Sequence, residues 1–206
     1  MAAGWVRSGG VSSYNAYGHP PNDVRLQLKR LGLDTETLEK EEKLRIIDWY
    51  TCQLGQKSNE KYAYHSLKIA DLSIVYSKTM IPAAGSPFPG TRYHLGPDVL
   101  RMGDDDSILM RFNDEKSFME YHRTREIPVG PARKSTNIDA LVKDVWSQYV
   151  YKSWEAAVDG IIDFKFEEEN KTTRDLMRIR SMRNVHFDRE WHELKVAENF
   201  EVTLEK

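Results

Sequence analysis

Three consecutive aspartates, Asp104, Asp105 and Asp106, directly follow the short apolar segment Val99–Met102, and Ser107 comes next. Carboxylates at the carboxyl end of a strand can hold Mg²⁺, which prefers oxygen ligands and keeps several of its waters. The same residues also suit a polar turn, because aspartates cap helix N-termini and complement their positive end. The segment therefore predicts either a magnesium-holding carboxylate or a turn that begins a helix.

Three arginines near the C-terminus form a second group with chemical potential. Arg178 and Arg180 alternate with Ile179, so in a strand both would project from one face, and Arg183 follows three residues after Arg180. A guanidinium is planar and permanently charged, which suits the binding of an anion. The alternative is a salt-bridged strand face opposite Glu167–Glu169 across a hairpin, and the residues alone leave both interpretations open.

Several other chemistries are excluded by composition. The single cysteine, Cys52, allows no intrachain disulfide and no cysteine-cluster metal site. His186 and His192 lack the i, i+4 spacing of a helical zinc pair, and no G-x-S-x-G elbow marks a serine hydrolase. With 30 basic and 32 acidic residues the chain is not a generally basic nucleic-acid binder. No apolar run reaches membrane-spanning length, so we expect a soluble cytoplasmic protein with no membrane partner.

The elements that must position these residues follow from periodicity and from start and stop signals. The segment 1–21 is rich in glycine and serine and is expected to be a flexible leader or an inserted strand near 11–17; the core would then span 22–206. Helices are expected at 22–31, 35–42, 61–80, 106–112, 114–121 and 147–159, and strands at 44–50, 99–102, 137–145, 161–166, 176–182 and 194–204. A long proline-rich loop covers 81–97. The alternation predicts an α/β sheet with an antiparallel C-terminal edge.

Several segments together resemble the KaiC-like branch of the RecA-superfamily ATPases, a group common in archaea. The resemblance is carried by His19–Asp34, Leu44–Tyr50, Leu100–Leu109, Tyr151–Phe164 (which contains Asp-Gly-Ile-Ile-Asp) and Met177–Arg183 (which contains Arg-Ser-Met-Arg). It implies a RecA-like, P-loop NTPase type three-layer sandwich that often forms hexamers, with ATP and Mg²⁺ as cofactors.

The resemblance also assigns roles to particular residues. It implies that Asp104, with Asp105 beside it, is the Walker B carboxylate that holds Mg²⁺, with Ser107 three residues further on. It further implies that Arg178 and Arg183 lie on a strand whose basic residues reach the ATP of a neighbouring subunit.

Three departures from the family pattern argue against ATPase activity. No glycine is followed by lysine anywhere in the 206 residues, so a GxxxxGK[ST] phosphate-binding loop is absent from this sequence. Gly18 stands where the family places a catalytic glutamate; His19 beside it is more simply a solvated loop residue than a base. Trp146 replaces a polar residue before the last helix, and an indole cannot accept a hydrogen bond.

Two hypotheses follow. The preferred one is a degenerate, non-catalytic KaiC-like protein that acts in regulation through protein–protein contacts, with copies of itself or with a full-length KaiC-like partner. The alternative is an active ATPase whose strand–P-loop–helix unit lies upstream of this chain. Because that strand is central in the family's sheet, its absence leads us to expect that the leader inserts as a strand, that an edge pairs with another chain, or that solubility is poor.

Overall fold

The described part of the chain divides into two units, Met1–Tyr151 and Lys152–Lys206. The structure is a computed structural model that describes residues 1–71, 99–104, 106–128, 136–169, 172–198 and 202–205. The expected loop at 81–97, residues 72–80 of the expected helix at 61–80, and Asp105 lie outside these residues. None of the helices described is long and apolar enough to cross a bilayer.

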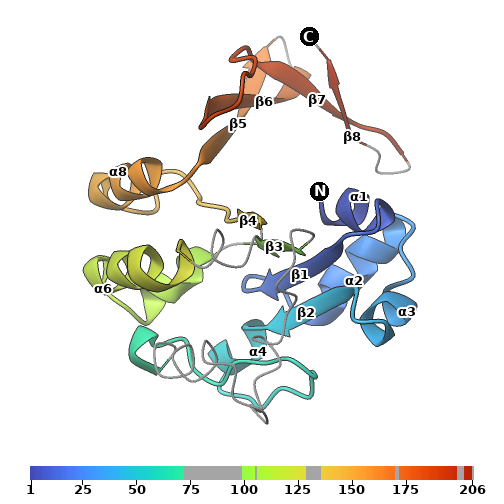
Figure 1. The fold of residues 1–206 in the computed structure, drawn as a ribbon, viewed down its shortest axis with the longest axis vertical. Helices are drawn as coiled ribbons and strands as arrows, with labels where there is room; N and C mark the ends of the chain where they lie inside the picture. The colour runs from blue at the N-terminus through green and yellow to red at the C-terminus, as the bar shows by residue number, and fades with distance from the viewer. Residues whose placement is uncertain (72–98, 105, 129–135, 170–171, 199–201, 206) are drawn as a thin grey trace. The chain divides into compact units, whose positions relative to one another are not determined.

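The first unit is built on a parallel sheet with the strand order β2-β1-β3-β4 (Figure 1). The strands are β1 Val11–Ala16, β2 Leu44–Asp48, β3 Val99–Gly103 and β4 Thr136–Ile138. Strand β1 pairs with β2 on one side and with β3 on the other, so the segment near 11–17 lies inside the sheet. All five residues of β2 are buried, as expected of a parallel strand covered on both faces.

Short helices cover the two faces of this sheet (Figure 1). They are α1 Ala2–Arg7, α2 Pro21–Arg30, α3 Thr35–Lys40, α4 Tyr50–Gln53, η2 Asp106–Arg111, α6 Glu115–Tyr121 and η3 His122–Glu126. A further helix, α8 Gln148–Ala157, begins in this unit and continues into the second. Helix α2 begins with a proline at its first position and ends before Gly32, whose φ of +77° favours glycine. Its Val24 and Leu28 pack with Leu44 and Ile46 of β2 in one buried cluster.

In the first unit, the largest differences between predicted and observed elements lie at 61–68 and 137–145. Residues 61–68 are not helical, because the backbone on both sides of Ala63 bonds to β2: Tyr62 O accepts from Asp48 N, and Tyr64 N donates to Asp48 O, each at 2.9 Å. The expected strand at 137–145 is also too long, since β4 ends at Ile138.

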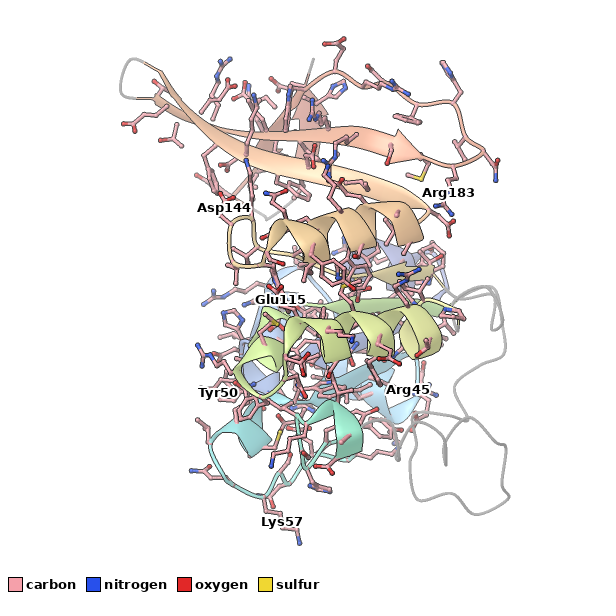
Figure 2. All side chains as sticks on the ribbon, turned by 90° about the vertical axis from the view of Figure 1, so that its left-hand side faces the viewer. Arg45, Tyr50, Lys57, Glu115, Asp144 and Arg183 are labelled. Atoms are coloured by element: carbon pink, nitrogen blue, oxygen red, sulfur yellow. The ribbon has the colours of Figure 1, made fainter. Side chains whose placement is uncertain are left out.

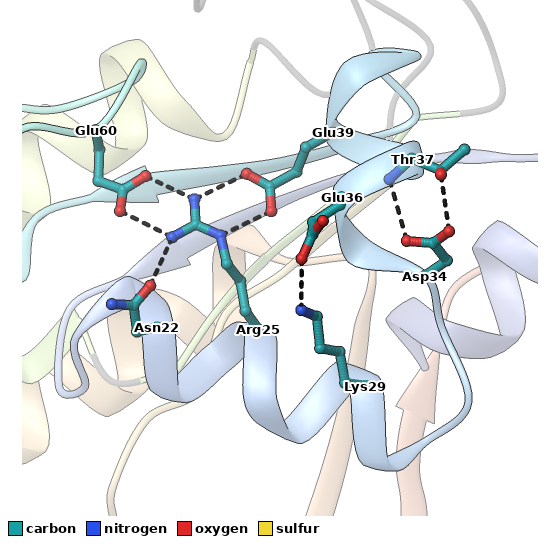
Figure 3. Close-up of polar contacts among 8 residues, drawn as sticks. All are labelled: Asn22, Arg25, Lys29, Asp34, Glu36, Thr37, Glu39 and Glu60. Atoms are coloured by element: carbon teal, nitrogen blue, oxygen red, sulfur yellow. Dashed lines mark hydrogen bonds and ion pairs between the residues drawn. The ribbon is translucent and has the colours of Figure 1, made fainter.

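A half-buried arginine joins α2 to two other segments (Figure 3). Arg25 donates two hydrogen bonds to Glu39 of α3, at 2.7 and 2.8 Å, and two to Glu60, at 2.8 and 2.6 Å. A third acceptor is Asn22 Oδ1, at 3.1 Å. Hydrogen bonds to Glu60 and Glu39 raise the pKa of Arg25 further above its ordinary value. The planar guanidinium serves two carboxylates at once, which lysine cannot do.

Replacing Arg25 with methionine is expected to lower the free energy of unfolding by about 2–3 kcal/mol, because two half-buried carboxylates would face each other without their cation. The matched control is Lys29→Met on the same helix. It breaks the exposed Lys29–Glu36 pair and should cost no more than about 0.5 kcal/mol. Urea denaturation followed by far-UV circular dichroism measures both, and equal losses would contradict the assignment.

Glu42 lies at the centre of a second polar cluster. Its carboxylate accepts hydrogen bonds from Arg45 Nε at 2.7 Å, from the Tyr62 hydroxyl at 2.8 and 2.7 Å, and from Lys61. Burial alone would raise the pKa of Glu42, but the bonds from Lys61, Tyr62 and Arg45 outweigh it and lower the pKa to about 2. The native state therefore prefers the ionised form more strongly than the unfolded chain does.

The linked stability is fully present above the ordinary glutamate pKa of 4.5 and is lost as the pH falls toward 2. We expect wild type to lose on the order of 1–2 kcal/mol more than Glu42→Gln over this range, after allowance for solvent screening. Urea midpoints measured from pH 5 to pH 2 check this. Parallel curves for the two proteins would show that Glu42 does not carry the effect.

The second unit is an antiparallel sheet with the order β5-β6-β7-β8. Its strands are β5 Gly160–Glu169, β6 Thr172–Met182, β7 His192–Val196 and β8 Val202–Glu205. The sequence predicted antiparallel C-terminal strands correctly, but the structure forms them into a separate sheet, and the single strand expected at 194–204 is two. Strand β5 extends through Glu167–Glu169, beyond the strand expected at 161–166, and pairs Glu169 with Thr172.

Candidate functional site

The carboxyl ends of β1, β2 and β3 meet at one edge of the parallel sheet, which is where open α/β sheets place their ligands. Three chain segments leave the sheet there. They are Tyr17–His19 after β1, Trp49 after β2 and Asp104 after β3. This edge contains the residue that the sequence singled out for magnesium, so its polar contacts decide what it can do.

Asp104 binds the loop that follows β1. Its Oδ1 accepts hydrogen bonds from the backbone N–H groups of Tyr17, at 2.7 Å, and Gly18, at 3.1 Å. Its Oδ2 accepts from Gly18 at 3.1 Å and from His19 at 3.2 Å, and His19 Nδ1 lies 3.2 Å from the same oxygen. The side chain is only 11% exposed. Both carboxylate oxygens therefore hold three consecutive amides of one turn.

An aromatic cluster supports this edge from β2. Trp49 is buried, stacks on Tyr64 with ring centroids 3.7 Å apart, and lies 4.9 Å from the Tyr17 ring. Its Nε1–H donates to Asn15 Oδ1 at 3.0 Å, and Asn15 Nδ2 donates to Met102 O of β3 at 3.2 Å. Asn15 thus connects the ends of all three strands through a single side chain.

Gly103 provides space for this arrangement. A Cβ atom placed on Gly103 would lie 3.1 Å from the Tyr17 ring, closer than ordinary van der Waals contact. The ring of Tyr17 occupies the space that a side chain at Gly103 would need. On the neighbouring strand, burial and the negative charge of Asp104 raise the pKa of Tyr14 to about 12, so its hydroxyl stays protonated at neutral pH.

The acidic segment continues after Asp104 with Asp105, Asp106 and Ser107. Ser107 lies in the 3₁₀ helix η2, and the side chains of Asp106 and Ser107 are outside the described part of the structure, as is Asp105. Within the described residues, no group of three His, Cys, Asp or Glu side chains is placed to hold a metal ion.

The arginines of β6 lie in the second unit and bind acceptors within it. Arg178 contacts Asp163 at 3.0 Å and lies 4.5 Å from the Trp191 ring, and Arg180 binds Glu155 at 2.8 Å. Arg178 and Arg180 therefore bind Asp163 and Glu155. Glu167, one of the partners expected from the sequence, pairs with Lys165 and Arg174.

Arg183 is placed differently from the other two. Figure 2 shows it beside the C-terminal end of α8. Its guanidinium donates to Ala156 O at 2.9 Å and lies 3.5 Å from Asp159, and its backbone N–H donates to Asp159 O at 2.7 Å. A cation at the end of a helix satisfies a free carbonyl and complements the dipole.

Sequence reasoning missed Asn15, Tyr17 and Trp49 as members of the edge. The available signal was their position, because each lies at or just beyond the end of a predicted strand, the one near 11–17 or the one at 44–50. Nothing in their spacing showed that residues 34 and 87 positions apart would bond, as Trp49 does to Asn15 and Asn15 does to Met102.

A parallel sheet covered by helices, with its polar residues at the carboxyl edge and an antiparallel C-terminal sheet, is the architecture of a RecA-like α/β protein. The structure is similar to that of a KaiC-like protein from the hyperthermophilic archaeon Pyrococcus horikoshii OT3, with a TM-score of 0.68 and 16% sequence identity. The match covers 100% of this chain and 80% of that chain. No family model and no curated protein matches the sequence. The resemblance to KaiC-like proteins is thus confirmed for the fold.

Proposed function

We propose that this chain is a non-catalytic protein with a KaiC-like fold, which acts in regulation through protein–protein contacts. The observation that carries the proposal is the engagement of Asp104. The residue that the family resemblance assigns to Mg²⁺ bonds instead to the backbone amides of Tyr17, Gly18 and His19. Its carboxylate stabilises a turn of this chain.

The donor set at this edge does not fit ATP and Mg²⁺. A magnesium ion held through water needs carboxylate oxygens that face its hydration shell, and both oxygens of Asp104 face N–H groups. A phosphate chain needs a glycine-rich loop with its lysine, and the sequence has no Gly-Lys pair. Gly18, at the place of the catalytic glutamate, has no side chain that could activate water.

The other positions that the family resemblance links to nucleotide, including the departure at Trp146, have contacts that also support a structural role. Trp146 is buried, with its ring 4.6 Å from that of Phe118. Arg178 is paired with Asp163, and Arg183 caps α8. An arginine that reaches into a neighbouring subunit would have to give up these contacts, at the cost of about 1–3 kcal/mol for a charged hydrogen bond.

A nucleotide titration tests the proposal. We expect no heat of binding and no shift of the unfolding midpoint when ATP and Mg²⁺ are added together to about 1 mM, since a ligand at a hundred times its Kd would stabilise the fold by about 2.7 kcal/mol. Mg²⁺ alone is the control for ionic effects. Micromolar binding of ATP would overturn the proposal and favour the alternative of an ATPase completed by a segment outside this sequence.

A further inference from the structure

One face of the antiparallel sheet carries several exposed apolar side chains. Phe164 and Phe166 of β5 are 60% and 80% exposed. The pairs Phe164–Met177, Leu194–Leu204 and Val196–Val202 place apolar side chains of the other strands on the same face, and Asp175 lies among them, opposite Phe166 and Leu194. Val196, Val202 and Leu204 are each at least half exposed. Exposed apolar side chains gathered on one sheet face, above all the two phenylalanines of β5, indicate an interaction site.

Strand β5 is also an edge of this sheet. Among the described strands it pairs only with β6, along its whole length from Gly160 to Glu169. Half of its backbone N–H and C=O groups therefore point away from the sheet, which is a template for pairing with another strand. The register is irregular only between Ile161 and Ile162, so the strand is regular from Ile162 onward.

The sequence of β5 is complementary to itself when two copies run antiparallel about Phe164. In that register Phe164 faces its own copy, and Ile162 lies opposite the partner's Phe166, so the apolar face continues across the two-fold axis. On the other face Asp163 lies opposite the partner's Lys165, twice by symmetry. Both opposite charges and aromatic–aliphatic pairs stabilise directly opposed positions of an antiparallel ladder.

Neighbouring registers lack this match. A two-fold axis at residue 163 or 165 brings Asp163 against its copy or Lys165 against its copy, and like charges at opposed positions are destabilising. An axis at Phe166 places Phe164 opposite the partner's Glu168. Registers centred between two residues would join the face of one copy that carries Phe164 to the face of the other copy that carries Asp163 and Lys165. Only the axis at Phe164 satisfies both faces.

Both charged residues already have partners within their own chain. Asp163 is held by Arg178 and by Arg180, at 3.0 and 3.3 Å, and Lys165 pairs with Glu167 and lies 4.3 Å from the Trp191 ring. Their side chains therefore lose little further freedom when a second copy arrives, which reduces the entropic cost of association.

We propose that β5 pairs antiparallel with β5 of a second copy, about a two-fold axis at Phe164, and joins the two antiparallel sheets into one. The pairing rests on the proposed contact role and names its partner as the chain itself. Its tests involve no nucleotide, so failure of the dimer leaves the nucleotide titration unaffected, and the reverse also holds.

Cysteine cross-linking tests the register. In a Cys52→Ser background, Phe164→Cys places the new thiols at directly opposed positions, with Cβ atoms about 5 Å apart, close to what a disulfide needs. The matched control Phe166→Cys places them four residues apart along the ladder, about 13 Å. We expect at least about tenfold more covalent dimer from Phe164→Cys under mild oxidation. Equal cross-linking of the two variants would overturn the register.

Sedimentation equilibrium of chains without added cysteines tests the dimer itself. Lys165→Glu should raise the dimer dissociation constant at least about tenfold, because it places two like charges at opposed positions. Lys195→Glu is the control. It makes the same charge reversal at the Lys195–Glu205 pair of β7 and β8, away from the β5 edge, and should leave the dimer dissociation constant unchanged. A wild-type chain that stays monomeric at about 100 μM, or equal effects of both variants, would overturn the proposal.

Discussion

Replacing Asp104 with alanine is expected to lower the free energy of unfolding by about 2–4 kcal/mol. The substitution removes a charged acceptor from three consecutive backbone N–H groups, those of Tyr17, Gly18 and His19. A hydrogen bond to a charged group contributes about 1.5–3 kcal/mol, and donors left without an acceptor at a partly buried site add a desolvation cost. The loop after β1 would lose its anchor to β3.

Asp104→Asn separates charge from shape. Asparagine keeps one acceptor oxygen but turns an NH₂ group toward the same donors, so we expect a loss between those of wild type and Asp104→Ala, about 1–2 kcal/mol. Asp114→Ala is the control, because Asp114 caps α6 with an exposed bond to Ser117 N at 2.9 Å, and its loss should destabilise the fold less than Asp104→Ala does.

Urea denaturation followed by far-UV circular dichroism measures these losses, with and without Mg²⁺. A structural carboxylate gives the same loss in both conditions. If Asp104→Ala were as stable as wild type, the bonds from Asp104 to the loop after β1 would not stabilise the fold. If Mg²⁺ stabilised wild type but not this variant, Asp104 would be a metal ligand. Either result would contradict the proposed function.

The elements that the sequence predicted well are those with local signals. The helix after Asp114 begins where its capping carboxylate accepts from Ser117 N, and α2 ends before Gly32, as the start and stop signals indicate. The prediction of a helix over 61–68 was wrong. Its helical spacing competes with backbone bonds to Asp48, a residue 14 positions from Tyr62 in the chain. Such a contact has no local signature.

The role of Asp104 could not be read from the sequence for the same reason. Its donors lie 85 to 87 positions away, and only the parallel pairing of β1 with β3 brings the two strand ends together. An aspartate after an apolar strand is equally compatible with a metal, a helix cap or a distant loop. The geometry selects the third, which the sequence had not suggested.

For Arg178 and Arg180, the sequence predicted the kind of partner, an acidic residue across a hairpin, but not which residues these are. A hairpin in which Glu169 pairs with Thr172 fixes the register of β5 and β6 as far as Ile162, and it sets Asp163 opposite Arg178 and Glu167 opposite Arg174. The expected partners of Arg178 and Arg180, Glu167–Glu169, lie instead opposite Arg174, Thr173 and Thr172. A shift of register along one hairpin was sufficient to change each ion pair on that face.

Replacing Trp49 with alanine is expected to lower the free energy of unfolding by about 3–5 kcal/mol, the usual cost of removing a large aromatic side chain from a packed interior. Trp49 is buried, stacks on Tyr64, and donates to Asn15. Its loss would leave a cavity where the three strand ends meet and would free the side chain that links β1 to β3.

Trp49→Phe isolates the hydrogen bond from the packing. Phenylalanine keeps a ring against Tyr64 but has no N–H, so Asn15 Oδ1 would lose its donor at a buried site, at a cost of about 1–3 kcal/mol. Far-UV circular dichroism is the required probe, because both variants remove a fluorophore. If the phenylalanine variant were as stable as wild type, Asn15 would not depend on Trp49, and the link between the strand ends would have to rest on its bond to Met102 alone.

The aromatic cluster and the Asp104 turn are also connected directly, because Asp104 N bonds to Asn15 O at 3.4 Å. If the losses of free energy of unfolding in Trp49→Phe and Asp104→Asn were not additive in the double variant, the cluster and the turn would act as one unit.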